Sequence, residues 1–308
     1  MNIVLKKIIH EICMEKNIDY KELSNGYIVE LKKEKKVRHL MGHLFDLNPQ
    51  AAGNIVNDKY ATFSVLKHNA VPVIEHEIVF NPSIRKDYMS ESDLWNKVTQ
   101  YFNENKQEIV IKPSKGNNGN HVYLCKNFSQ VENAIVQCFK EGPTVVLCPF
   151  YSSFAEYRTF YLDGECLFTF KKMKPFVVGD GLSTLQELID KTSYTIPENS
   201  LKDLSLSSIP KGNEKIELVW KFNLSGGAVA EFLEDTALEK EIHKIVKEAS
   251  HYLNIRFATV DVLHTVNGGL KILEVNSGIC MEKLISQIDS GYQIAKNIYG
   301  KAIDKMFG

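Results

Sequence analysis

Apolar and polar positions along the chain follow two periods, one typical of amphipathic helices and one typical of strands. Apolar residues recur at helical spacing in 3–16, 47–69, 90–105, 128–140, 183–191, 236–253 and the segment after residue 280. Alternating or continuous apolar runs predict strands within 20–42, 71–79, 109–125, 144–150, 157–170, 216–224 and 257–275. The segment 192–215 is rich in Ser, Pro and Asn and predicts a loop.

Short polar residues mark where several of these elements begin or turn. Asn48 and Pro49 predict the N-cap and the first helical position of the second helix, and Ser90 predicts the N-cap of the third. Asn25-Gly26 predicts a tight hairpin turn. Because antiparallel hairpins alternate with helices, the pattern indicates an α+β fold and not a doubly wound parallel sheet.

The composition is that of an ordinary globular chain. Its 308 residues are enough for one large domain or two to three small ones, and 37 Lys and Arg residues nearly balance 38 Asp and Glu residues. This balance indicates neither nucleic acid nor a membrane surface as a partner, and no apolar run is long enough for a membrane span. The N-terminal segment has acidic residues and helical periodicity in place of a signal peptide.

The cysteines indicate whether the protein is expected in a reducing or an oxidising compartment. Six of them are scattered along the chain without a C-x-x-C pair, at positions 13, 125, 138, 148, 166 and 280. Most lie in apolar segments, so the pattern predicts reduced core thiols in a cytoplasmic protein. It argues against a zinc site or a disulfide framework.

The last predicted hairpin contains the first candidate site. Glu274 and Asn276 lie two residues apart on its outgoing strand, so both side chains leave the same face. If the turn at 267–269 pairs the two strands, Asp261 comes opposite or diagonal to Glu274. Two carboxylates and one amide are hard oxygen donors that suit Mg²⁺. The alternative is a solvent-facing polar edge, which the apolar flanking residues argue against.

A second candidate is the loop that follows Lys112. It contains Ser114, Lys115, Gly116, Asn117, Asn118, Gly119 and Asn120. Glycines let backbone N–H groups approach phosphates, and Lys112 supplies a cation at the base of the loop. The polar composition predicts a mobile lid over a nucleotide. The loop does not match the Walker pattern, and an ordinary hairpin turn is the alternative.

A third candidate lies where an apolar strand runs into Pro149. Proline leaves backbone groups that cannot all pair in a ladder, so Cys148, Pro149 and Phe150 could hold a flat base through the main chain. Glu156 could then accept hydrogen bonds from ribose hydroxyls, and Arg158 faces the same side by strand alternation. A plain core strand is the alternative.

The fourth candidate consists of two lysine-containing segments that each precede glycines. Cations and amide donors that converge on one place suit a highly charged reaction centre. Solvated lysine-rich loops are the alternative. The residues are Lys171, Lys172 and Lys174 before a Gly-Asp-Gly turn, and Lys221 and Asn223 before Gly226-Gly227.

Taken together, the four candidates resemble the ATP-grasp superfamily of carboxylate–amine ligases. "NDKYATFSVLKHNAVPV" resembles the Asp-Lys helix that begins these domains, and "IVIKPSKGNNGNHV" resembles their lysine strand and phosphate-covering loop. "VLCPFY" with "EYRTFYLDGE" is similar to the hinge and ribose segment, and "VDV" with "ILEVNSG" to the metal-binding strand pair. "PFVVGDGLSTLQELI" and "FNLSGG" are most similar to cyanophycin synthetase and the ligase module of bifunctional glutathione synthetases.

The resemblance covers residues 57–285 and implies an ATP-grasp fold. In this fold, two α+β subdomains grip ATP between antiparallel sheets, here behind a short N-terminal α/β segment. The implied boundaries are 1–56 for the N-terminal segment, 57–149 for the first subdomain and 150–308 for the second. By the same resemblance, Lys59 and Lys112 hold the phosphates, the 114–119 loop covers them, and Glu156 holds the ribose.

The implied activity is an ATP- and Mg²⁺-dependent ligase, with Mn²⁺ as a second candidate metal. ATP phosphorylates a carboxylate, either an amino acid or a peptide-like acid, and an amine attacks the acylphosphate to give an amide, ADP and phosphate. Asp261, Glu274 and Asn276 would hold the metal. The catalytic residues would be Lys172, Lys221, Asn223 and Arg158; Lys172 and Lys221 stand where relatives commonly carry arginine.

The expected partners are small-molecule or peptide substrates, without nucleic acid or membrane, and a homodimer is compatible with the resemblance. Two other classes remain open. One is an ATP-dependent phosphotransferase, which would need no amine. The other is a nucleotide-binding protein without catalysis, which the complete set of metal ligands and both phosphate lysines argue against.

Overall fold

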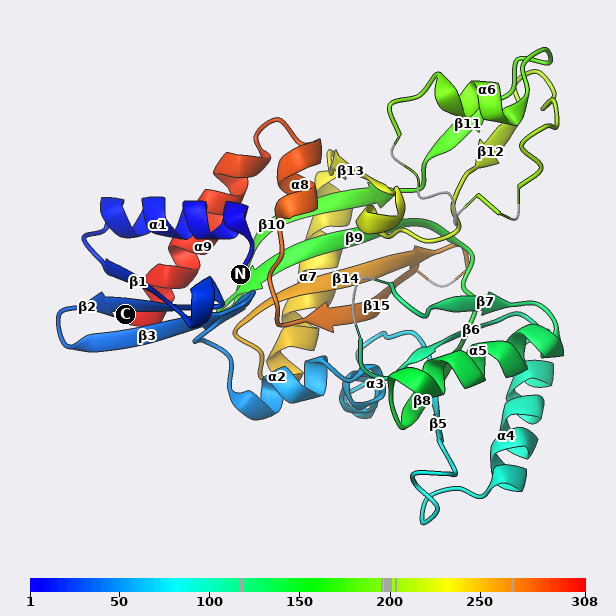
Figure 1. Cartoon of the computed structure of the whole chain (residues 1–308), viewed down its shortest axis with the longest axis horizontal. Helices are drawn as coiled ribbons and strands as arrows, with labels where there is room; N and C mark the ends of the chain where they lie inside the picture. Colours follow the sequence, from blue (N-terminus) through cyan, green and yellow to red (C-terminus); the bar gives the residue numbers. More distant parts are fainter. Residues whose placement is uncertain (117–118, 195, 197–200, 203, 268) are drawn as a thin grey trace.

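The computed structural model describes residues 1–116, 119–194, 196, 201–202, 204–267 and 269–308. These residues form a central sheet flanked by an N-terminal unit on one side and a smaller sheet with two helices on the other (Figure 1). A small lobe projects from the central sheet. The mixed helices and antiparallel sheets confirm the predicted α+β class.

The central sheet carries most of the predicted site residues. Its strands are all antiparallel and lie in the order β13 (Val229–Phe232), β10 (Glu165–Met173), β9 (Ser153–Leu162), β14 (Phe257–Thr265) and β15 (Gly269–Asn276). One face is apolar and packs against α7 (Thr236–Tyr252), which lies behind the sheet in Figure 1. On the other face, Phe160, Phe170 and Phe257 belong to the core shared with the N-terminal unit. The charged residues described below occupy the rest of that face.

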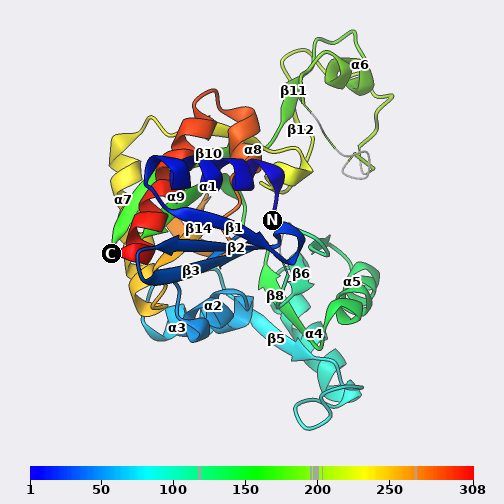
Figure 2. The same ribbon diagram turned by 60° about the vertical axis from the view of Figure 1, so that its left-hand side comes forward.

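The N-terminal unit shares its core with the C-terminal helices. Its elements are α1 (Ile3–Glu15), β1 (Asp19–Leu23), the 3₁₀ turn η1 (Ser24–Gly26), β2 (Ile28–Lys33), β3 (Lys36–Met41) and β4 (Leu44–Phe45). The predicted Asn25-Gly26 turn is confirmed, with both residues at positive φ. Figure 2 shows α1 beside α9 (Gly291–Phe307), and α8 (Glu282–Gln287) precedes α9. Ile8, Leu31 and Tyr299 are therefore buried in one core.

The second sheet has the antiparallel order β5 (Glu77–Phe80), β8 (Thr144–Pro149), β6 (Ile109–Pro113) and β7 (Tyr123–Cys125). It packs against α4 (Glu91–Glu104) and α5 (Phe128–Glu141). The predicted cap of α4 is confirmed, because the Ser90 side chain accepts from the Asp93 N–H. The projecting lobe contains β11 (Phe176–Val178), α6 (Leu185–Asp190) and β12 (Lys215–Glu217) around a small core of its own.

The single helix predicted over 47–69 is wrong. It is two helices, α2 (Gln50–Val56) and α3 (Lys59–His68), because the Asp58 side chain caps α3 by accepting from two N–H groups. Asn48 is not an N-cap either. Its amide donates to the Phe257 carbonyl at 2.7 Å, and its oxygen accepts from the Arg256 and Phe257 N–H groups, which tethers this segment to the start of β14.

Two predicted strands are shorter than expected. In the predicted strand 71–79, only the residues from Glu77 onward belong to a strand, β5. Val73 forms a single bridge to Ile272 of the central sheet. The strand predicted over 216–224 ends at Glu217, and Asn223 instead caps the 3₁₀ turn η3 (Leu224–Gly226). Parts of the predicted 192–215 loop lie outside the described residues. Among the helices that the structure describes, none has the length and apolar character needed to cross a membrane.

Candidate active site

Four charged side chains form an ion cluster on the central sheet, in which Arg158 is partly exposed and the other three are buried: Glu156, Arg158, Lys172 and Asp261. The guanidinium of Arg158 donates to both carboxylate oxygens of Asp261, at 2.7 and 2.6 Å. Lys172 contacts Glu156 and lies 3.1 Å from the second oxygen of Asp261. The side chains of Lys172 and Asp261 are each only 4% exposed, so their charges compensate one another away from water.

Strand register explains why these residues meet. Arg158 on β9 stands opposite Asp261 on β14, and Lys172 on β10 stands opposite Glu156. Directly opposite residues share a face, so three adjacent strands supply one continuous charged surface. The sequence-based expectation that Glu156 and Arg158 face the same side is confirmed.

The two carboxylates of the ion cluster have opposite pKa shifts. Burial raises the pKa of Asp261, but the charges of Arg158 and Lys172 outweigh burial and lower it to about 2. Burial raises the pKa of Glu156 to about 7, because the charge of Lys172 offsets only part of that rise and Asp261 adds to it. The cluster therefore holds one firmly ionised carboxylate and one that gains a proton easily.

This difference predicts how stability depends on pH. Because the folded-state pKa of Glu156 lies above the unfolded value, its contribution is complete below the unfolded pKa of 4.5 and is lost as pH rises through about 7. In the wild type, the free energy of unfolding should therefore fall by on the order of 1–3 kcal/mol across this pH window. We expect Glu156→Gln to remove this fall. Urea denaturation between pH 4.5 and 8 measures it. Glu165→Gln, at an exposed carboxylate, is the control; equal pH slopes for Glu156→Gln and wild type would contradict the assignment.

The predicted metal-binding residues lie on one edge of this surface. Asp261 and Glu274 are direct cross-strand partners, as the hairpin predicted, and Asn276 follows two residues later on β15. The side chain of Glu274 is 27% exposed, and the Lys59 ammonium lies 3.9 Å from its oxygen. The three residues thus present carboxylate and amide oxygens next to a lysine.

The start of the predicted phosphate loop is anchored beside Lys59. Ser114 donates its hydroxyl hydrogen to Asp58 at 2.6 Å, and Lys59 N–H donates to the Ser114 carbonyl at 2.9 Å. Lys115 forms a bridge with Asp58, and the Lys59 ammonium donates to the Gly116 carbonyl at 2.7 Å. Asp58 therefore caps α3 and binds the loop at the same time.

The far end of the loop reaches the predicted reaction centre. The Lys221 ammonium lies 3.4 Å from the Gly119 carbonyl. Gly119 has φ +67°, which strains any other residue, and a Cβ there would come within 2.6 Å of the Asn223 amide nitrogen and would force that side chain to move. Burial lowers the pKa of Lys221. Asn117 and Asn118 lie outside the described residues.

A largely buried lysine lies at the base of the loop. Lys112 on β6 is 6% exposed, and no hydrogen-bond or ion-pair partner for it is found in the part of the chain that the structure describes. Burial lowers the pKa of His76 well below its usual value, and the charges of Lys112 and Lys59 lower it further. His76 Nδ1 lies 3.1 Å from the Ile74 carbonyl, whereas its Nε2 is buried without a partner among the described residues.

His76 is a candidate that the sequence interpretation missed. Its only signal was a histidine in the otherwise mostly apolar run 71–80. A buried cation and a buried nitrogen without partners cost free energy unless a ligand pairs with them. This region is therefore suited to an anion that brings hydrogen-bond acceptors to Lys112 and Lys59.

The predicted base-binding segment lies at the end of β8. Cys148 is buried, and its thiol lies 3.6 Å from the Val110 carbonyl, while Pro149 ends the strand. Phe150 N–H donates to the Glu108 carbonyl at 3.2 Å, and its ring contacts Trp220 edge-on at 6.3 Å between centroids. The segment thus lies between the second sheet and the stretch that carries Lys221.

The remaining lysines of the fourth candidate lie apart from the ion cluster. Lys171 alternates to the opposite face from Lys172, and Lys174 pairs with Glu217 at 2.9 Å.

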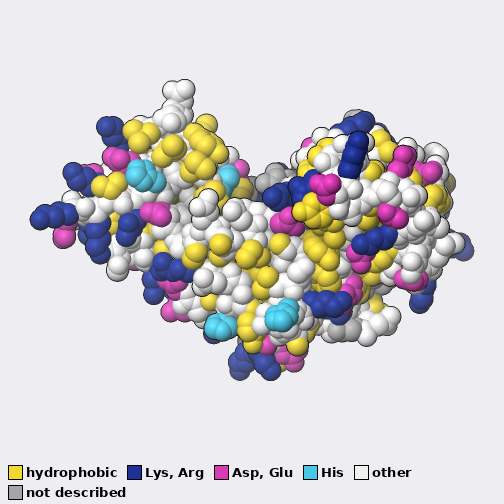
Figure 3. Space-filling view, turned by 90° about the horizontal axis from the view of Figure 1, so that it is seen from below, with side chains coloured by type: hydrophobic (Ala, Val, Ile, Leu, Met, Phe, Trp, Pro, Cys, Tyr) yellow, Lys and Arg dark blue, Asp and Glu magenta, His cyan; other side chains and the backbone are white. Residues whose placement is uncertain are grey.

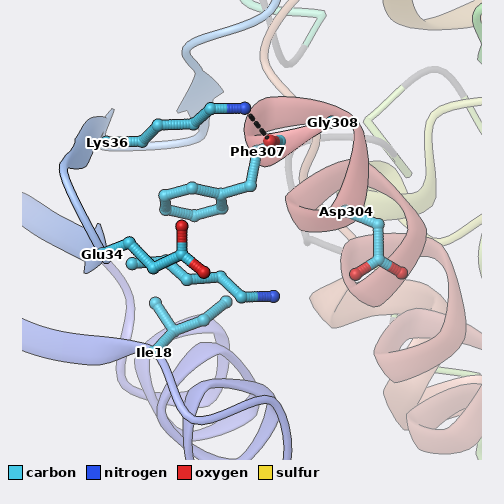
Figure 4. Close-up of a pocket in the computed structure, with 7 residues that line it drawn as sticks. Ile18, Glu34, Lys36, Asp304, Phe307 and Gly308 are labelled. Carbon is cyan, nitrogen blue, oxygen red and sulfur yellow. Dashed lines mark hydrogen bonds between the residues drawn. The ribbon is translucent and has the colours of Figure 1, made fainter.

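The view from below shows charged side chains beside a hollow between the two ends of the molecule (Figure 3). A separate cavity adjoins the end of α9, where Lys36 donates to the Phe307 carbonyl (Figure 4). The lining of that cavity includes none of the predicted site residues.

This arrangement of two antiparallel sheets, a glycine loop between them and a charged surface on the larger sheet is the ATP-grasp fold. In agreement, the chain superposes on a bifunctional glutathione synthetase from Pasteurella multocida with a TM-score of 0.55 and 17% identity, over 98% of this chain and 44% of that one. No protein-family model matches the chain.

Individual relatives identify the class of ligase that the chain resembles. It is 29% identical over 151 residues to the glutathione biosynthesis bifunctional protein of Streptococcus agalactiae, which is 41% of this chain and 20% of the relative. It is 21% identical to cyanophycin synthetase of Trichormus variabilis over 95% of this chain and 34% of the relative. The chain thus spans a fifth to a third of these relatives' length. Its resemblance to ATP-grasp ligases in sequence and fold confirms that prediction.

Proposed function

We propose that this chain is an ATP-dependent ligase that joins a carboxylate to an amine through an acylphosphate and releases ADP and phosphate. The observation that carries this proposal is the position of the phosphate loop. Its first glycine, Gly116, contacts Lys59 beside Glu274, and its last, Gly119, contacts Lys221 and Asn223. The two glycines of this loop therefore contact residues of the proposed phosphate site and of the proposed acceptor site, and the first lies beside the proposed metal site.

In this proposal, Lys112 and Lys59 donate hydrogen bonds to phosphate oxygens of ATP. Burial lowers the pKa of Lys59, and the charge of Lys112 lowers it further, so a phosphate between them would relieve that repulsion. Ser114, Lys115 and the backbone of residues 116–119 cover the phosphates. Cys148, Pro149 and Phe150 hold the base, and Glu156 reaches the ribose.

Asp261, Glu274 and Asn276 would hold Mg²⁺, and their chemistry fits that ion. All three offer hard oxygen atoms, and the first carboxylate oxygen of Asp261 accepts only from Arg158 among the described residues, so it has a lone pair to spare. Mn²⁺ accepts the same ligands. When bound, the ion would neutralise phosphate charge. Arg158 holds the Asp261 carboxylate in place and acts as a positioning residue.

The acceptor side would consist of Lys221 and Asn223, together with Lys172 of the ion cluster. Lys221 is partly desolvated, so its charge interacts more strongly with a bound carboxylate than it would in water. Such fixed charges position the carboxylate and stabilise the charge that develops during phosphoryl transfer and amide formation. Lys172 neutralises Glu156 and Asp261, so that the surface can accept another ligand.

A screen of carboxylates with and without amines tests the proposed reaction. The expected result is ADP and phosphate release that needs both an acid and an amine, together with an amide product detected by mass spectrometry. Turnover with the acid alone that yields a stable phosphorylated product would replace the ligase with a phosphotransferase. ATP binding without turnover across the screen would favour a non-catalytic nucleotide-binding protein.

Replacing Lys112 with methionine tests the nucleotide site by itself. We expect Lys112→Met to weaken ATP binding by at least about 100-fold, since a phosphate loses a buried cation. We also expect the ligand-free protein to become more stable, by about 1–2 kcal/mol, because a largely buried charge with no partner among the described residues is removed. Calorimetric titration and denaturation measure the two effects. Lys126→Met, at an exposed lysine, is the control; equal ATP affinity in the two variants would refute the role of Lys112.

The substrates we propose are a small-molecule or peptide carboxylate and an amine. A homodimer, a cytoplasmic location and the boundaries at residues 56 and 149 also stay predictions. The boundaries can be tested by limited proteolysis, and the assembly by light scattering.

A further inference from the structure

Three potential metal ligands meet at the border between the N-terminal unit and the segment that follows β15. His43 lies in the turn between β3 and β4, Cys280 lies beyond the end of β15, and Glu282 begins α8. One ligand atom from each lies within 4.8 Å of the other two. The spacing of the cysteines gave no sign of this group, because His43 comes from the opposite end of the chain.

Two of these side chains have buried atoms without partners. His43 Nδ1 and a carboxylate oxygen of Glu282 are both inaccessible to water and have no hydrogen-bond partner among the described residues. Leaving such atoms unpaired costs free energy, because neither atom regains the hydrogen bond that water offered it. A cation that accepts one lone pair from the imidazole and one from the carboxylate would remove both costs.

The backbone holds the ligand segments in place. Ile279 N–H donates to the His43 carbonyl at 3.0 Å, and the Tyr299 hydroxyl donates to the Ile279 carbonyl at 3.0 Å. Gly278 packs against His43, whose Cβ would lie 3.8 Å from a Cβ at position 278. The three ligands are thus brought together by contacts that do not depend on the ligands themselves, as a preorganised site requires.

The kinds of atom present indicate which ion would bind. Imidazole nitrogen, thiolate sulfur and carboxylate oxygen together suit Zn²⁺, whereas a thiolate disfavours Mg²⁺. One thiolate and one carboxylate neutralise a divalent charge, and the imidazole adds none. Cys280 is exposed, so a fourth position remains open to water or to another ligand.

We propose a Zn²⁺ site formed by His43, Cys280 and Glu282, which joins the N-terminal unit to the segment after the β14–β15 hairpin. The ion would form bonds to the β3–β4 turn and to the start of α8, which lie far apart in sequence. Binding to the folded state alone would stabilise the fold by mass action. The site differs from the proposed Mg²⁺ site in its ligands, and its test requires no ligase activity.

Titration of the reduced, metal-stripped full chain with Co²⁺ tests the site without any activity assay. The expected result is one equivalent with a thiolate-to-cobalt charge-transfer band and intense visible bands of tetrahedral geometry, displaced by Zn²⁺ and not by excess Mg²⁺. Cys280→Ser should lose the charge-transfer band, and His43→Gln and Glu282→Gln should bind at least about tenfold more weakly. The matched control is Cys166→Ser, at a thiol away from the cluster, which should behave as wild type.

Thermal unfolding supplies an independent readout. Zn²⁺ should raise the midpoint of the wild type and of Cys166→Ser by the same amount, and should raise the midpoint of His43→Gln clearly less. If Cys280→Ser does not fold, the His43→Gln and Glu282→Gln titrations still decide the question. A wild-type chain without the charge-transfer band, or a band that persists in all three cluster variants, overturns the proposal.

Discussion

Replacing Glu274 with glutamine is expected to lower ATP-dependent turnover by at least ~100-fold while the protein stays folded. The substitution keeps the shape of the side chain but removes the charge that the proposed metal site needs. The free energy of unfolding should change by no more than about 0.5 kcal/mol, because Glu274 is partly exposed and its 3.9 Å pair with Lys59 is weak. Lys59 also keeps its bond to Gly116.

The measurement is ADP release with the acid and amine found by screening, at several Mg²⁺ concentrations. Glu22→Gln is the matched control, since Glu22 is a partly exposed carboxylate that pairs with Lys6 in the N-terminal unit. Loss of activity in Glu274→Gln should be partly overcome by high Mg²⁺ if the residue holds the ion. Turnover within about threefold of the wild type would rule out the assigned role.

Lys221→Ala is expected to reduce kcat/KM for the carboxylate by about 100-fold and to change ATP affinity by less than about threefold. Lys221 contacts Gly119 at the far end of the phosphate loop and lies beside Asn223, so we assign it to the acceptor and not to the adenine. Lys221→Arg should restore part of the activity, because arginine retains the charge and can bind a carboxylate with two hydrogen bonds.

Steady-state kinetics and ATP titration separate the two substrates. The control is Lys215→Ala, because Lys215 lies over the Phe176 ring in the projecting lobe. If Lys221→Ala weakens ATP and carboxylate binding equally, Lys221 acts on the loop and not on the acceptor. The chemistry itself is tested with ¹⁸O-labelled carboxylate: an acylphosphate route moves one label into the released phosphate, whereas an adenylate route leaves none there.

Much of the candidate site could be predicted from sequence because it rests on strand alternation and hairpin pairing. Glu274 and Asn276 are two residues apart, and a hairpin with a short turn leaves few ways to place Asp261, which lies opposite Glu274 as expected. The same rule placed Glu156 and Arg158 on one face. These relations depend on local geometry, so distant parts of the chain do not change them.

The partners of these residues could not be predicted in this way. The sequence assigned both Arg158 and Lys172 to catalysis, but it did not indicate that both contact Asp261 in one ion cluster. That contact requires β9 to lie between β10 and β14, which is a matter of strand order and not of periodicity. Asn48 illustrates the same limit, since its side chain bonds to the start of β14 instead of capping the adjacent helix.

The sequence by itself determined the α+β class, most of the helices and hairpins, and the set of oxygen, lysine and glycine residues that carry the chemistry. These follow from periodicity, turn residues and cross-strand spacing, which act over a few neighbouring positions. The tertiary structure alone decided that Gly116 contacts Lys59 and Gly119 contacts Lys221, that Lys112 and the unpaired Nε2 of His76 are buried among the described residues, and that His43 meets Cys280 and Glu282. The reason is that these contacts join residues far apart in the chain, and only the packing of sheets and helices brings such residues together.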